Sequence, residues 1–204
     1  MKPRLLSSLC TLLLGVTTLL AQPSPSPSYA DLVNPLIGTQ SSFELSSGNT
    51  YPVIARPWGM NAWTPQTGKM GDGWQYSYNA TKLRGFKQTH QPSPWINDYG
   101  QFSIFPEVTS TPIFDEERRA SWFSHKSETA HPYAYEVYLA DYDTEVRLSP
   151  TERAVTFEIA FPKQAHPDSC WVLIDAFDSG SELHQQDTYT LVGISRKNSG
   201  GVPA

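Results

Sequence analysis

The sequence predicts an all-β protein folded as an antiparallel β-sandwich, and three observations carry this prediction. The chain contains 17 prolines and 13 glycines in 204 residues, a composition typical of short strands joined by many turns. Its second half alternates apolar and polar residues with the period of two that a half-buried strand requires. The segments between are turn-forming clusters such as DYDTE and SPTER, without the 3.6-residue period of a helix. Strands joined by short loops pair antiparallel, so two packed sheets are expected.

Five segments in the second half share this strand pattern. They are residues 133–139, 145–148, 154–161, 171–174 and 188–196. The alternation is clearest in 154–161, where Val155, Phe157 and Ile159 fall on one face. Residues 171–174 form an unbroken apolar run, which predicts a strand buried on both faces.

The length of the chain corresponds to one domain. We assign residues 31–204 to the β-sandwich. Residues 115–120 are the only helical candidate, with one or two turns at most. Residues 22–30, with the sequence QPSPSPSYA, form a Pro/Ser-rich spacer that we expect to be extended and solvated.

The N-terminus has the pattern of a secretory signal peptide. Lys2 and Arg4 precede an apolar run over residues 5–20, and Ala21 offers a cleavage position. We therefore predict a signal peptide over residues 1–21 and an exported chain, periplasmic or extracellular. The apolar run is short for a transmembrane helix, so stable membrane insertion is not expected.

Charge and cysteine content narrow the classes of partner. The formal net charge is −5, and removal of residues 1–21, which hold two basic residues and no acid, leaves 13 basic against 20 acidic residues, or −7. Such a surface repels phosphates, so nucleic acid is not an expected partner. Cys170 is the only cysteine after residue 21, so no intrachain disulfide can form. The five histidines lack the paired spacing of a metal motif.

Residues 48–99 hold four of the six tryptophans, Trp58, Trp63, Trp74 and Trp95. They lie among Gly, Pro, Asn, Asp, Gln and His rather than among Val, Ile and Leu. A pyranose has apolar C–H faces that stack on an aromatic ring and hydroxyls that need paired donors and acceptors. The group therefore indicates a carbohydrate-facing surface. For any single tryptophan the alternative, a ring that fills a loop-rich β core, stays open.

Six short motifs occur in a fixed order along the chain. They are VNPLIGT (33–39), GNTYP (48–52), PWGMNAWTPQTG (57–68), GWQYSY (73–78), RGFKQTHQPSPWINDYG (84–100) and TERA (151–154). Each motif alone is weak, but together they resemble the N-terminal domain of glycoside hydrolase family 92, the calcium-dependent exo-acting α-mannosidases. The resemblance is greatest to members that cut α-1,2-linked mannose, and it covers nearly all of the chain after the spacer.

The resemblance implies a β-sandwich followed by a larger α-helical barrel, in proteins several times longer than this chain. We therefore expect the sandwich to be incomplete and a helical catalytic domain to be its missing partner. In that family the general acid, the general base and the calcium ligands come mainly from the helical domain. The resemblance thus assigns no catalytic residue and no metal ligand here, and it implies calcium only for the full-length family member.

What the resemblance does imply for this chain is substrate contact. In the family the active site lies between the two domains, and aromatic residues of the β domain shape the pocket around the terminal mannose. The positions that fit are Trp63, Trp74, His90, Trp95 and Asp98. Trp63 and Trp74 are the best candidates for stacking on the sugar. His90 fits a structural hydrogen bond equally well, and Asp98 fits an acceptor that holds its loop.

Three functional hypotheses follow. The first is the N-terminal part of an exported α-1,2-mannosidase-like glycoside hydrolase that acts on mannose-containing glycans, contributes pocket residues and is inactive alone. The second is a stand-alone carbohydrate-binding module. The third is a non-catalytic exported interaction domain, which burial of Trp63, Trp74 and Trp95 would favour. Whether the chain is itself an enzyme stays open at this point.

Overall fold

The fold is known from a computed structural model, which describes residues 28–40, 50–70, 75–89, 102–176 and 181–196. Twelve strands and three 3₁₀ helices make up the regular structure of these residues, and no α-helix occurs among them. The prediction of an all-β protein is therefore confirmed. None of the described helices is long and apolar enough to cross a membrane. The predicted signal peptide and most of the predicted spacer lie outside the described residues.

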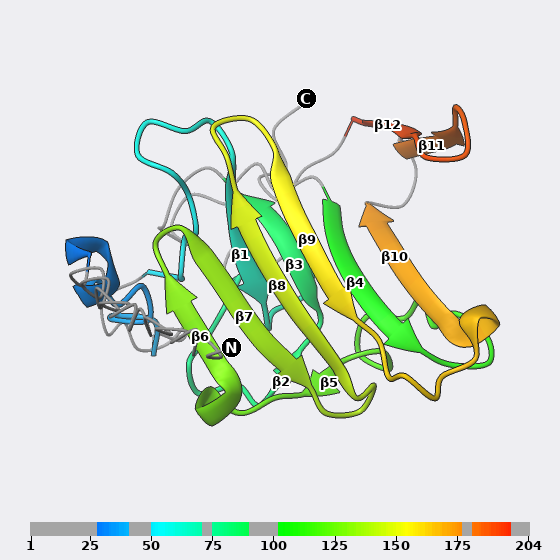
Figure 1. The fold of residues 1–204 in the computed structure, drawn as a ribbon, viewed down its shortest axis with the longest axis horizontal. Helices are drawn as coiled ribbons and strands as arrows, with labels where there is room; N and C mark the ends of the chain where they lie inside the picture. Colours follow the sequence, from blue (N-terminus) through cyan, green and yellow to red (C-terminus); the bar gives the residue numbers. More distant parts are fainter. Residues whose placement is uncertain (1–27, 41–49, 71–74, 90–101, 177–180, 197–204) are drawn as a thin grey trace, which may run out of the picture.

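The strands form two four-stranded antiparallel sheets and two short ladders (Figure 1). The first sheet has the order β1-β3-β4-β10, with β1 (Ala62–Gln66), β3 (Gly85–Thr89), β4 (Phe102–Val108) and β10 (Cys170–Ala176). The second has the order β6-β7-β8-β9, with β6 (Glu128–His131), β7 (Ala134–Leu139), β8 (Thr144–Pro150) and β9 (Val155–Ala160). The ladders pair β2 (Lys82–Leu83) with β5 (Ser121–Trp122), and β11 (Ser181–Gln185) with β12 (Leu191–Ser195). The 3₁₀ helices are η1 (Tyr29–Leu32), η2 (His125–Ser127) and η3 (Pro167–Ser169).

Aromatic side chains join the two sheets into a sandwich. Phe157 of β9 meets Trp63 of β1 with ring centroids 5.2 Å apart, and it meets Phe86 of β3 at 6.1 Å. Phe86 also meets Tyr135 of β7, again at 6.1 Å. Trp63, Phe86 and Tyr135 are almost fully buried. Removal of these large apolar rings from water is thus a major source of the attraction between the sheets.

The clearest predicted strands are confirmed as β7, β8 and β9, with ends shifted by one or two residues. Their alternation places Val137, Val146 and Leu148 in the core, each at most 1% exposed. The helical candidate at 115–120 forms only a single turn, in which the Arg119 backbone N–H donates to the Asp115 carbonyl oxygen at 3.0 Å.

The outer face of the first sheet is buried as well, under polar chain segments. Lys87 of β3 is fully buried, and its Nζ donates to the carbonyl oxygen of Met70. Glu107 of β4 is also fully buried and accepts a hydrogen bond from the Ile113 N–H at 2.7 Å. Since both faces are covered, all five residues of β1 are buried, polar ones included.

The prediction that residues 171–174 are buried on both faces is wrong. These residues belong to β10, where Leu173 is 7% exposed but Val172 and Ile174 are 51% and 38% exposed. Ile174 pairs with Ile104 of β4, which packs against the core, so Val172 and Ile174 lie on the face that is turned toward the second sheet. Figure 1 shows that the second sheet ends at β9 and that β10 lies beyond it. The apolar run therefore marks a continuation of the sandwich interior that no described residue fully covers.

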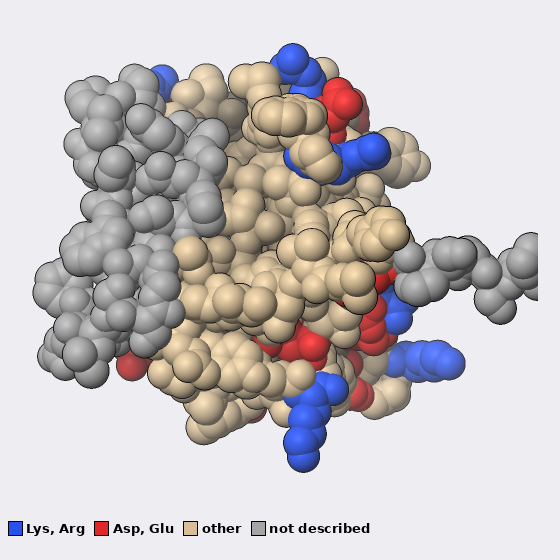
Figure 2. Space-filling view, turned by 90° about the vertical axis from the view of Figure 1, so that its left-hand side faces the viewer, with Lys and Arg blue, Asp and Glu red and all other residues tan. Residues whose placement is uncertain are grey.

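One side of the molecule is poor in charge. Figure 2 faces the side where η1 and β6 lie, and its central part is uncharged, with charged atoms in its upper, lower and right-hand parts. In the described N-terminal segment, Leu32, Val33 and Ile37 are each more than half exposed. Exposed apolar side chains that gather in this way are typical of a surface that contacts another molecule.

Candidate functional site

The predicted site begins at the end of β1 and β3. Trp63 lies on β1 and pairs with Gln88 of β3, and the next pair is Ala62 with Thr89. β3 ends at Thr89, the residue before His90. Trp63 is the one predicted contact residue within the described part of the chain. Trp74, His90, Trp95 and Asp98 lie outside it.

Trp63 has the environment of a core residue. Its side chain is 2% exposed and lies edge-on against Phe102, at 5.7 Å, and against Phe157, at 5.2 Å. Its indole Nε1–H donates to Asn61 Oδ1 at 2.9 Å, so its polar atom is satisfied. In this arrangement the ring packs the sandwich, and sugar contact by Trp63 stays a prediction. Burial of Trp63, Trp74 and Trp95 would favour the third hypothesis, a non-catalytic interaction domain, and Trp63 meets this condition.

Buried hydrogen bonds fix the chain around Trp63. We call Tyr51, Asn61, Trp63, Gln88 and Thr89 the Trp63 cluster. Asn61 Nδ2 donates to the carbonyl oxygen of Ala154 at 2.6 Å, and the Tyr51 hydroxyl lies 2.6 Å from Thr89 Oγ1. Four of the six motifs, which lie as far apart in the sequence as Tyr51 and Ala154, thus meet at one end of the sandwich. Burial and paired polar groups make this end rigid, which is a property that a binding site needs.

A second buried centre surrounds Glu128, a residue that sequence reasoning did not single out. The Glu128 carboxylate is fully buried and accepts hydrogen bonds from the Tyr76 hydroxyl at 3.0 Å and the Tyr135 hydroxyl at 2.6 Å. His125 Nδ1 lies 2.5 Å from its other oxygen. His125 Nε2 faces the Tyr78 carbonyl oxygen at 2.7 Å, and because a carbonyl only accepts, this nitrogen carries a proton.

This arrangement makes the Glu128 centre structural. Burial, together with the adjacent Glu128 charge, raises the pKa of Tyr135 well above its ordinary value and raises the pKa of Tyr76 in the same way. Both hydroxyls therefore keep their protons and remain donors. A carboxylate held by these groups has no free position for a substrate. Its effect is to tie β6 to β7 and to residues 75–78, the segment that follows Trp74.

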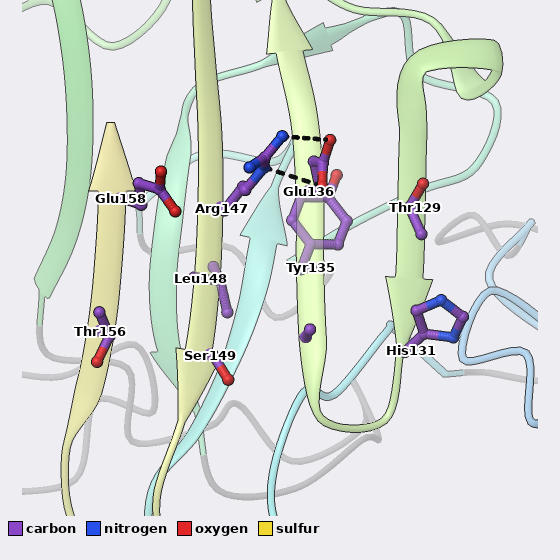
Figure 3. A pocket seen from close by; sticks show the side chains of 10 residues that line it. Thr129, His131, Tyr135, Glu136, Arg147, Leu148, Ser149, Thr156 and Glu158 are labelled. Carbon is purple, nitrogen blue, oxygen red and sulfur yellow. Dashed lines mark hydrogen bonds and ion pairs between the residues drawn. The ribbon is translucent and has the colours of Figure 1, made fainter. Parts of the chain in front are cut away.

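The outer face of the second sheet carries a hollow of about 380 Å³, whose exposed lining is mostly apolar (Figure 3). Its polar lining residues are Thr129, His131, Glu136, Arg147, Ser149, Thr156 and Glu158. Arg147 Nε lies 3.0 Å from Glu136 Oε2, and Arg147 also pairs with Glu145 at 3.4 Å. These carboxylates, Glu136 first, raise the pKa of Arg147, which stays charged at any physiological pH. The lining holds two glutamates against one arginine, so the hollow has a net negative charge and suits a ligand that carries no negative charge.

The described residues do not form a metal centre. No group of three or more His, Cys, Asp or Glu side chains among them could hold an ion. The expectation that the chain itself binds no cofactor stays a prediction.

Comparison with known proteins adds to this geometry. The sequence model described as "Glycosyl hydrolase family 92 N-terminal domain" matches residues 32–203. Among solved structures, the chain is similar to the family GH92 inverting mannosidase BT2199 from Bacteroides thetaiotaomicron VPI-5482, with 45% sequence identity and a TM-score of 0.77, over 87% of this chain and 24% of that one. It is also similar to the family GH92 α-mannosidase BT3965 from Bacteroides thetaiotaomicron, with 28% identity and a TM-score of 0.66, over 80% and 23% of the two chains. BT3965 has also been solved in complex with mannoimidazole. No curated protein matches the chain. The chain thus spans about a quarter of the length of the solved relatives.

Proposed function

Since this chain belongs to the glycosyl hydrolase family 92 N-terminal domain family, we propose that it is the N-terminal β-sandwich of an exported α-mannosidase that acts on mannose-containing glycans. One observation carries the proposal. The chain shares 45% of its residues, over 87% of its length, with a GH92 mannosidase of known structure. We further propose α-1,2-linked mannose as the substrate linkage, on the resemblance of the six motifs.

In this proposal the chain contributes part of the substrate pocket. The contact residues are Trp63, Trp74, His90, Trp95 and Asp98, as the motifs imply. The support is the Trp63 cluster, which gathers four family motifs at one end of the sandwich. A rigid, buried base of this kind fixes the described chain as far as Thr89, the residue before His90, and a preformed site loses less entropy when a sugar binds.

We propose that the catalytic carboxylates come from polypeptide beyond this segment, so that the segment is inactive alone. Inverting hydrolysis needs an acid and a base roughly 6.5–9.5 Å apart on opposite sides of a sugar. Among the described carboxylates, Glu128 is saturated by donors and Glu136 is paired with Arg147. Glu107 is buried against the Ile113 N–H. None of these three carboxylates is free for a substrate. The calcium that the family resemblance implies is proposed to bind outside this segment too.

Exposed apolar residues on the inner face of the first sheet support the proposal that a further domain packs against this segment. Val172 and Ile174 continue the core beyond β9, yet they are 51% and 38% exposed. Leu183, Leu191 and Ile194 of the β11–β12 hairpin are also half exposed. We propose that the helical catalytic domain of the family, or the strands that lead to it, covers these residues.

Mannose release tests the proposal. The purified chain is assayed on α-1,2-mannobiose alone and after mixing with BT2199 that lacks its matching N-terminal segment, with calcium and with EDTA. We expect no release by either part alone and calcium-dependent release by the mixture. Calcium-dependent release by the chain alone would place the catalytic carboxylates within these 204 residues and overturn the proposal.

Two other functions have specific support. The hollow on the outer face of the second sheet, with apolar area and polar side chains in its lining, favours a stand-alone carbohydrate-binding module, which would bind mannosides without any other domain. Burial of Trp63 and the uncharged side in Figure 2 favour a non-catalytic interaction domain. Saturable mannoside binding with no complementation would select the module. A chain that neither binds mannosides nor complements the truncated BT2199 would be identified as an interaction domain.

A further inference from the structure

Trp58 stands at the tip of a tight turn with its side chain in water. The Gly59 N–H donates to the Arg56 carbonyl oxygen at 2.9 Å, and Trp58 has φ of 64°. This hydrogen bond, with Pro57 at the second position and a positive φ at the third, matches a type II turn. The third position of such a turn favours glycine, because a Cβ is strained there. The Trp58 side chain is 100% exposed.

Stability therefore does not explain a tryptophan at this position. A fully exposed ring removes no apolar surface from water, and its Cβ adds strain that glycine would avoid. A strained backbone that carries a large exposed side chain is a reason to look for function.

The turn is rigidly held beside a second turn, residues 151–154. The Met60 N–H donates to the Glu152 carbonyl oxygen at 2.9 Å, and Asn61 Nδ2 donates to the Ala154 carbonyl oxygen at 2.6 Å. A Cβ on Gly59 would lie only 3.6 Å from Glu152 Cα, so the two turns touch. Both turns belong to the motifs that identify the family.

The surroundings of Trp58 have the chemistry of a saccharide site. Arg56, Glu152 and Arg153 are exposed on the same pair of turns and supply donors and acceptors near an aromatic ring. A pyranose needs this combination, since its C–H face stacks on the ring while its hydroxyls need polar partners. Tryptophan is also a common anchor in protein interfaces, and Met60 is exposed on the same segment, so the test below separates sugar binding from protein contact.

The hollow on the second sheet begins close to these turns. Ser149 and Thr156 pair across β8 and β9, two residues before and two residues after the 151–154 turn. Figure 3 shows both side chains at one end of the hollow, with Arg147 and Glu158 toward the other end. The hollow thus begins two residues from the turn that touches the Trp58 turn.

We propose that Trp58 is a saccharide-stacking residue and that a neutral oligosaccharide bound there extends over the 151–154 turn into the hollow on β6–β9. The identity of the sugar as a mannoside rests on the proposed function, whereas the stacking itself needs only a neutral hexose. Trp58 belongs to the tryptophan group that indicates a carbohydrate-facing surface, but it is not among the contact residues that the family resemblance implies.

Indole N–H signals in ¹H–¹⁵N NMR spectra of the whole chain test the inference, with α-1,2-mannobiose and α-1,2-mannotriose as probes. The Trp58 signal is identified as the one that Trp58→Gly removes. We expect it to shift on titration, and Trp58→Gly to weaken mannobiose binding about tenfold, in line with the usual worth of a stacked ring. Because glycine suits the turn, Trp58→Gly should change the melting temperature by less than about 3 °C.

Trp122→Ala is the matched control. Trp122 is 50% exposed on β5, which lies at the opposite end of the molecule in Figure 1, so its loss should leave binding unchanged. Thr156→Arg, which fills the hollow, should weaken mannotriose binding more than mannobiose binding.

Three results would overturn the inference. They are titration of other signals while Trp58 stays fixed, equal losses in Trp58→Gly and Trp122→Ala, and absence of any sugar binding. A Trp58 shift caused by truncated BT2199 but not by sugar would identify a protein anchor instead. Mannose release by the complemented protein is measured separately, so failure of the inference is distinguished from failure of the proposed function.

Discussion

Gly85 lies where β3 and β4 approach too closely for a side chain, and Gly85→Ala tests this packing. A Cβ at Gly85 would lie 1.9 Å from Ser103 Oγ, 3.2 Å from Ser103 Cβ and 3.0 Å from Gln66 Oε1. Ser103 and Gln66 are fully buried, so neither side chain has free space to move into. Overpacking of this kind costs about 1–3 kcal/mol. For a chain of this size the melting temperature should fall by about 3–10 °C.

Thermal and urea unfolding followed by circular dichroism measure the effect. Gly193→Ala in β12 is the control, because its nearest contacts are ordinary at 3.4 Å and glycine-to-alanine changes without a clash are neutral or stabilising. Ser103→Gly removes the two close Ser103 atoms and leaves only the 3.0 Å contact with Gln66 Oε1. The double variant Gly85→Ala/Ser103→Gly should therefore recover at least about 1 kcal/mol relative to the sum of the single changes. A Gly85→Ala protein as stable as the wild type, or additive effects in the double variant, would refute the reasoning.

Three further predictions follow from burial and charge. Glu128→Ala should destabilise the fold by about 3–5 kcal/mol in urea unfolding, because it leaves two buried tyrosine hydroxyls without their acceptor. A variant as stable as the wild type would contradict the structural role of Glu128. Burial raises the pKa of Glu107 in the folded chain. At a pH above the pKa that Glu107 has in the unfolded chain, its ionisation therefore opposes folding, and this cost disappears as the pH falls below that pKa. Glu107→Gln should therefore stabilise the chain more at pH 7 than at pH 4, and an equal effect at both pH values would refute the assignment. On β10, Leu173→Ala should lower the free energy of unfolding by about 2–4 kcal/mol and Ile174→Ala by less than about 1.5 kcal/mol, since only Leu173 is buried. Equal losses for the two variants would contradict the exposure of Ile174 on the inner face.

The sequence predicts the second sheet better than the first, for a physical reason. β7, β8 and β9 have one face in the core and one in water, so their residues alternate visibly. β1, with the sequence AWTPQ, is buried at every position because chain segments cover its outer face. Thr64 Oγ1 and Gln66 Nε2 donate to nearby carbonyl oxygens, whereas the buried Gln66 Oε1 has no hydrogen-bond partner among the described residues. A buried strand with polar residues and a proline carries no periodic signal. The prediction that β10 is buried on both faces was wrong because an apolar run shows that the side chains are apolar, but not whether other residues cover them.

The candidate site divides in the same way. The order of the motifs predicts that distant segments meet, and at Trp63 they do. Glu128 carried no signal, because Tyr76 is 52 residues away in the chain and Tyr135 belongs to another strand. The position of Trp58 at the tip of a turn depends on its own positive φ. The composition of the surrounding sequence does not reveal this backbone conformation.

A chimera tests the central claim most directly. The matching N-terminal segment of BT2199 is replaced by residues 31–204 of this chain, and mannose release from α-1,2-mannobiose is measured with calcium and with EDTA. If this chain is the N-terminal part of a mannosidase, the chimera should fold and release mannose, and EDTA should abolish the release. A folded chimera that releases no mannose, while intact BT2199 does so under the same conditions, would contradict the proposed function.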